Sequence, residues 1–105
     1  MRRESAKRLL DAQTAASRIS RYAAGRSFED YARDDYFRSA VERQFEVLGE
    51  ALNAAKRGEP ELVLHSPELA EIVGLRNKIV QGYDSVDDQI VWTRSRMTSQ
   101  VCSIG

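Results

Sequence analysis

The stretch DYFRSAVERQFEVLGEALNAA, residues 35–55, decides the fold class, because its apolar residues recur at steps of three and four. This spacing gathers them on one face of an α-helix. Asp34 or Asp35 can cap the start of the helix, and Gly58 and Pro60 end the pattern. A long helix with one apolar face needs other elements to cover that face. The apolar residues are Phe37, Val41, Phe45, Leu48, Leu52 and Ala55.

The residues before this stretch predict a second amphipathic helix and a short turn. Gly25 is a natural stop for the helix. Ser27 and Asp30 then form a capping-box pattern with Asp in place of Glu, and it opens a turn in which Phe28 and Tyr31 fold back onto the core. The apolar stripe of the first helix consists of Leu9, Ala12, Ala16, Ile19 and Ala23.

The residues after this stretch predict two further helices. Ser66 and Pro67 are a typical N-cap and first helical residue, and the helix that they begin should end near Gly82. Residues 84–88 then offer a fresh cap. The apolar face of the third helix is expected to contain Leu69, Ile72, Val73, Ile79 and Val80, and that of the fourth Val86 and Ile90, with Met97 as a further candidate.

No segment has the pattern of a strand pair, so we predict an all-α fold, an antiparallel four-helix bundle with a short extra turn around residues 28–33. Residues 1–92 are expected to form a single domain, and residues 93–105 a C-terminal tail that holds the end of the last helix or frays. Gly49 lies inside a helix at a cost of about 1 kcal/mol against Ala. It marks either a close approach by another helix or a tolerated glycine.

Composition limits the function classes. With 105 residues, 42% hydrophobic and 30% charged, the chain fits one domain, and a domain this small gains by burying a helix face in a second copy, so we expect a homodimer. Sixteen basic and sixteen acidic residues argue against nucleic-acid binding by bulk charge. Residues 1–26 nevertheless carry seven Arg or Lys against two acids. They offer phosphate contacts or, more ordinarily, a solvated helix face.

Cys102 is the only cysteine, which excludes an internal disulfide and a Cys-rich zinc site. No apolar run approaches the roughly 20 residues of a membrane span, and the first ten residues lack an apolar signal core. We therefore expect a cytoplasmic protein without a membrane span. No nucleotide-binding glycine loop is present, and no cofactor is expected.

The segment LRNKIVQGY, residues 75–83, carries the chemistry, and it resembles the signature of HEPN domains. That signature is an arginine, a polar residue, a short spacer and a histidine, and here Gln81 stands at the histidine position. With Tyr83 the segment is similar to the Arg-x4-His-x-Tyr form of HepT-like toxins. Further segments extend the resemblance over residues 8–92: Arg8 to Leu10, Ser27 to Tyr31, Ala40 to Ala51, and Val86 to Trp92.

The resemblance implies the toxin of a type VII (HEPN/MNT) toxin-antitoxin system, a metal-independent endoribonuclease that cuts RNA, such as tRNA or mRNA, at a composite site of a homodimer. It implies Arg76, Asn77 and position 81 as catalytic residues. It also implies a nucleotidyltransferase antitoxin of the MNT type, which transfers AMP to Tyr83. A non-enzymatic helical module that binds nucleotide or protein is the alternative.

The chemistry of these side chains fits this expectation in part. Arg76 can grip a phosphate through two hydrogen bonds at any working pH, and Asn77 can orient the arginine or the sugar. Position 81 lies five residues further, about 140° around a helix, so facing helices of two subunits would bring both to one phosphate. The Gln81 amide cannot exchange a proton near neutral pH. Loss of a general acid or base costs about 10²–10⁴-fold in rate, so we expect impaired cleavage.

Other candidates have simpler explanations. His65 has no second histidine to join it in a metal site or a catalytic pair. Trp92 is expected to pack in the core or at the dimer contact rather than to stack on a base. The pairs at residues 34–35 and 87–88 could suggest metal ligands, but each lies where a helix needs a cap.

Overall fold

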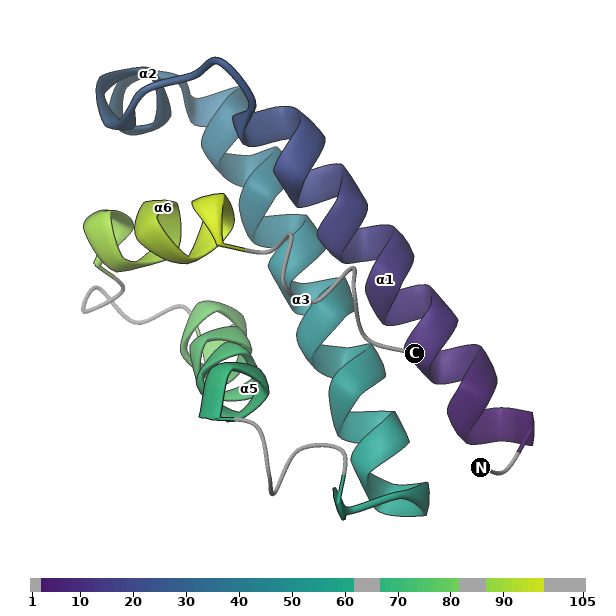
Figure 1. Ribbon diagram of the computed structural model, residues 1–105. Coiled ribbons are helices and arrows are strands. Elements are labelled where there is room, and N and C mark those ends of the chain that lie inside the picture. The colour runs from purple at the N-terminus through teal and green to yellow at the C-terminus, as the bar shows by residue number, and fades with distance from the viewer. Residues whose placement is uncertain (1–2, 62–66, 82–86, 98–105) are drawn as a thin grey trace.

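The computed structural model describes residues 3–61, 67–81 and 87–97, and every regular element in those ranges is a helix. They are α1 (Arg3–Ala23), α2 (Phe28–Arg33), α3 (Asp35–Gly58), α5 (Pro67–Gln81) and α6 (Asp88–Arg96). Four longer helices and one short helix confirm the predicted all-α bundle (Figure 1).

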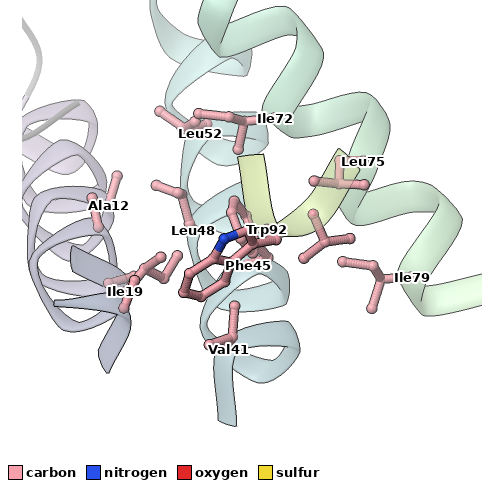
Figure 2. Packing of buried hydrophobic residues seen from close by; sticks show 14 of the residues in the cluster. Ala12, Ile19, Val41, Phe45, Leu48, Leu52, Ile72, Leu75, Ile79 and Trp92 are labelled. Atoms are coloured by element: carbon pink, nitrogen blue, oxygen red, sulfur yellow. The ribbon is translucent and has the colours of Figure 1, made fainter. Parts of the chain in front are cut away.

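The pair α1 and α3 forms the long side of the molecule, where the two helices lie next to each other in opposite directions (Figure 1). Every residue of the two predicted apolar stripes is buried. Small residues on α1, among them Ala12 and Ala16, let the larger side chains of α3 approach closely. In Figure 2, Ile19 of α1 and Phe45 of α3 lie in the same cluster.

The short helix α2 is joined to α3 without a loop. Asp30 N donates to the Ser27 hydroxyl and Ser27 N donates to the Asp30 carboxylate, which confirms the capping box. Asp34 is at once the C-cap of α2 and the N-cap of α3, where its carboxylate accepts from Phe37 N at 3.1 Å. Arg38 donates to the carbonyls of the last turn of α2, at 2.7 Å for Ala32. One residue therefore ends one helix and begins the next.

Three aromatic rings join α2, α3 and α6. The Tyr31 ring lies 5.7 Å from Phe37 and 5.6 Å from Trp92, and Phe37 and Trp92 are 5.9 Å apart. All three side chains are buried, and Trp92 belongs to the same buried cluster as Phe45 (Figure 2). The predicted packing roles of Tyr31 and Trp92 are confirmed.

Helix α5 packs on α3, with Leu69, Ile72, Leu75 and Ile79 buried. Figure 2 labels the last three. The expected place of Val80 on the apolar face was wrong, since its side chain is exposed. Leu75 lies between Ile72 and Ile79 at helical spacing and completes that face instead.

Asp87 caps α6 by accepting from Gln89 N at 2.9 Å, and the helix runs past Trp92 to Arg96. Val91 and Trp92 are its buried apolar residues, whereas Ile90 is exposed and Met97 is an exposed C-cap, so the expected stripe was wrong. The adjacent side chains of Val91 and Trp92 are enough to pack the short helix α6 against the core. The predicted roles of Ser66 and Val86 and most of the tail lie outside the described residues.

Candidate functional site

Arg76 lies where α5 crosses α3 at Gly49. A methyl group built on Gly49 would lie 2.3 Å from Cβ and 2.5 Å from Cγ of Arg76, so only glycine leaves room for this crossing. Gly49 is itself buried. Of the two interpretations of Gly49 in the sequence, the close approach of another helix is confirmed, and the approaching residue is Arg76.

Two protein acceptors hold the guanidinium of Arg76. Its Nη2 donates to Glu50 Oε2 at 2.5 Å, and its Nη1 donates to Asn77 Oδ1 at 2.9 Å. The Nε atom is buried and has no hydrogen-bond partner among the described residues. A guanidinium has five N–H donors. Among the described residues, one N–H on each terminal nitrogen therefore has no protein acceptor and can bind a ligand, on a side chain that is 23% exposed.

The exposed edge of Arg76 opens into a surface pocket of about 460 Å³ between α1, α3 and α5. Arg8 and Arg18 of α1 and Arg43 of α3 line the same pocket. The carboxylates there are those of Asp11, Glu46 and Glu50. The four arginines and three carboxylates leave the pocket with a small excess of positive charge. Within the pocket, Glu46 forms an ion pair with Arg43 at 3.2 Å.

Gln81 is the last residue of α5, and it is exposed. On an ideal helix it lies about 140° around and about 7.5 Å along the axis from Arg76. It does not line the pocket at Arg76. The two side chains therefore do not meet within one chain. Tyr83 lies outside the described residues.

A second group of ionisable side chains lies where α2, α3 and α6 meet. Burial raises the pKa of Glu42, and the nearby carboxylate of Asp88 raises it further. Burial also raises the pKa of Tyr31, whose hydroxyl has no hydrogen-bond partner among the described residues. Glu46, which lines the Arg76 pocket, also raises the pKa of Glu42, but Glu42, Tyr31 and Asp88 themselves do not line that pocket.

The remaining sequence candidates fall outside the pocket. Asp34 and Asp87 cap helices, as the sequence indicated, and His65 lies outside the described residues. Over residues 3–61, 67–81 and 87–97, no three His, Cys, Asp or Glu side chains are grouped in a way that could hold a metal. In those same ranges, none of the helices has the length and apolar character to cross a bilayer.

Sequence reasoning missed Glu50 and the arginines outside α5. Glu50 follows Gly49, and the glycine signalled a helix crossing. Which residue crosses there is a tertiary fact that no local pattern encodes. The basic bias of the first 26 residues was a signal for Arg8 and Arg18, but an ordinary solvated face explained it equally well.

Comparison with known proteins gives the family. The protein family described as "Ribonuclease HepT-like" matches residues 12–97 of this chain. The chain is 34% identical over 68 residues to "Putative RNase TTE0752" of Caldanaerobacter subterraneus subsp. tengcongensis, a match that covers 65% of this chain and 60% of that protein. It is 28% identical over 78 residues to "Putative RNase MJ1216" of Methanocaldococcus jannaschii, with 74% and 64% covered. The chain thus spans less than two thirds of the length of either relative. No solved structure matches. The match over residues 12–97 shows that the chain belongs to the HepT-like ribonuclease family, whose domain is of the HEPN type.

Proposed function

We propose that this chain is a HEPN-type endoribonuclease toxin that binds RNA at Arg76 and whose cleavage is impaired by Gln81. The observation that carries the proposal is the state of Arg76. Its guanidinium is fixed by Glu50 and Asn77, retains two N–H groups and faces a pocket that three further arginines line. Two N–H groups on a planar fork match two phosphate oxygens.

The reaction needs no metal in this proposal. The 2′-hydroxyl of RNA attacks the adjacent phosphorus, one group accepts the hydroxyl proton, and another donates a proton to the leaving 5′-oxygen. Arg76 would neutralise charge on the phosphorane. A histidine at position 81 would exchange protons near neutral pH, whereas the Gln81 amide only forms hydrogen bonds. Binding with little cleavage is the expected outcome.

A second copy of the chain would complete the site. Arg76 and Gln81 lie on different sides of α5, so one phosphate reaches both only if the two residues come from different subunits. The homodimer is therefore part of the proposal, with Arg76 of one copy facing position 81 of the other.

Regulation by a nucleotidyltransferase antitoxin of the MNT type is also part of the proposal, with the reaction taking place in the cytoplasm. Transfer of AMP from ATP to the Tyr83 hydroxyl, with release of pyrophosphate, would add bulk and negative charge seven residues beyond Arg76. A phosphate-bearing group near the arginine would compete with the RNA phosphate. After incubation with the nucleotidyltransferase and ATP, mass spectrometry should show that the mass of the chain has increased by one AMP group. The Tyr83→Phe variant should show no increase.

The decisive experiment compares cleavage of total RNA and tRNA by this chain and by Gln81→His, with chelator present. We expect cleavage by the restored variant at least about 10²-fold faster, the lower range for a general acid or base. Arg76→Ala in the restored background should abolish it. Lys78→Ala is the matched control, because it removes an exposed cation from the same helix outside the Arg76 pocket and should leave cleavage intact.

Mixing two silent variants tests the composite site. The original chain offers Arg76 without a histidine, and a chain with both Arg76→Ala and Gln81→His offers the histidine without Arg76. Neither should cut RNA alone. After subunit exchange, a heterodimer would hold one complete site, and cleavage should return. If the mixture still does not cleave RNA while the Gln81→His homodimer does, a site shared between subunits is excluded.

A non-enzymatic binding module is the second candidate, and Gln81 favours it because the amide cannot transfer a proton. It predicts that Gln81→His is as silent as the original chain while Arg76→Ala still lowers affinity for RNA or nucleotide. The same set of variants therefore separates the two functions.

A further inference from the structure

Glu50 is the acceptor that bonds to Arg76 from another helix, among the residues that the structure describes. Its Oε2 lies 2.5 Å from Arg76 Nη2, and the two residues are 26 positions apart in the sequence. The other acceptor, Asn77, is the neighbour of Arg76 on α5 and moves with it. Among the described residues, Glu50 is the one hydrogen-bond acceptor that links the guanidinium to α3.

We propose that Glu50 is a positioning residue that orients the Arg76 guanidinium for an RNA phosphate, an inference that rests on the proposed function. Without Glu50, the long side chain of Arg76 would sample several rotamers and would lose side-chain entropy on each binding event. With Glu50, the fork is already in place. The loss of Arg76 side-chain entropy then occurs on folding rather than on ligand binding.

Two adjacent residues of α3, Gly49 and Glu50, act on opposite ends of the Arg76 side chain. Gly49 removes the side chain that would otherwise hold α5 away, since a methyl group there would meet Arg76 Cβ at 2.3 Å. Glu50, the next residue, then reaches the far end of the same arginine. The Glu50 side chain is 59% exposed, so packing against the core does not explain its place.

The proposal predicts an effect opposite to that of simple electrostatics. Removing a carboxylate from an RNA-binding face should tighten binding, because RNA is a polyanion. If Glu50 positions Arg76, removing it should weaken binding instead. Glu46 is a matched control, because it lines the same pocket but pairs with Arg43 rather than with Arg76.

The test measures binding of a fluorescein-labelled tRNA to the original Gln81 chain, in which cleavage does not interfere. Glu50→Ala should weaken binding by roughly threefold to tenfold, a fraction of what a charged hydrogen bond contributes. Glu46→Ala should leave affinity unchanged or raise it. Glu50→Gln keeps an acceptor for Nη2 and should lose less than Glu50→Ala, and circular dichroism melts confirm that each variant is folded.

A double-mutant cycle separates positioning from a general structural defect. In the Arg76→Ala background, Glu50→Ala should cause no further loss, because nothing remains to be positioned. The slope of log K against log salt should also fall by about 1 for Arg76→Ala and by a similar amount for Glu50→Ala, as for one lost phosphate contact.

The outcomes that overturn the inference differ from those that overturn the function. If Glu50→Ala tightens binding as Glu46→Ala does, while Arg76→Ala weakens it, Glu50 is not a positioning residue and the RNA site stands. Equal losses for Glu50→Ala with and without Arg76 would also reject positioning. If Arg76→Ala leaves RNA binding unchanged, the proposed function itself fails.

Discussion

Replacement of Gly49 by alanine tests the geometry on which the site depends. The added methyl group would lie 2.3 Å from Arg76 Cβ, whereas carbon atoms pack at about 3.5–4.0 Å. A gap of more than about 1 Å must therefore open. Arg76 Cβ cannot rotate away, because the backbone of α5 fixes its position. The helix itself must move, and its buried residues must move with it.

The net effect on stability follows from two opposing contributions. Overpacking in a close helix contact costs about 1–3 kcal/mol, and a clash at Cβ belongs near the upper end. Alanine in a helix interior recovers about 1 kcal/mol relative to glycine. The expected net loss is about 1–2 kcal/mol, which for a domain of this size lowers Tm by roughly 5–10 °C.

Thermal melts by circular dichroism measure this change, and Gly74→Ala is the matched control. Gly74 also lies within a helix, but a methyl group there meets nothing within 4 Å. This variant should raise Tm by several degrees, through helix propensity alone. A Gly49→Ala protein that melts at or above the original temperature would refute the close crossing. Displacement of Arg76 should also weaken tRNA binding in Gly49→Ala and leave it unchanged in Gly74→Ala.

Three further substitutions test the polar groups outside the pocket. Tyr31→Phe removes a buried hydroxyl that has no partner among the described residues, and urea denaturation should show a gain of about 1 kcal/mol. Burial, with Asp88 nearby, raises the pKa of Glu42, so its ionised form destabilises the fold. Glu42→Gln should therefore raise Tm at pH 7, and the gain should shrink as the pH falls through the folded pKa. The backbone hydrogen bond from Ser27 lowers the pKa of Asp30, so the sign reverses. Asp30→Asn should lower Tm at pH 7, and melts at falling pH should show the loss vanish below the folded pKa.

Much of the fold could be predicted because its helices are strongly patterned. The stripes of α1 and α3 repeat over several turns, so every apolar residue that the pattern assigned is buried, and the buried residues that it missed, Ala15 and Ala51 among them, are small. Caps at Ser27, Asp34 and Asp87 were equally local, since each bonds to a backbone group within three residues. Errors came on α5 and α6, at Val80 and Ile90, where short apolar runs leave the orientation of a helix ambiguous.

The site could be predicted only along α5. Arg76, Asn77 and Gln81 are visible in one segment because their spacing is local. The partner Glu50 and the pocket arginines come from α3 and α1, and their convergence depends on how the helices cross. Gly49 indicated that another helix crosses α3 there, but the sequence did not identify the residue of that helix that contacts it.

The junction at Asp34 restricts how the chain can change in length. Because this single residue ends α2 and begins α3, no linker exists there to absorb an insertion. One added residue would turn α2 by about 100° relative to α3. Tyr31 would then leave the rings of Phe37 and Trp92, and α6 would lose its aromatic anchor. Length variation among relatives should therefore avoid this junction and gather in the connections between the other helices.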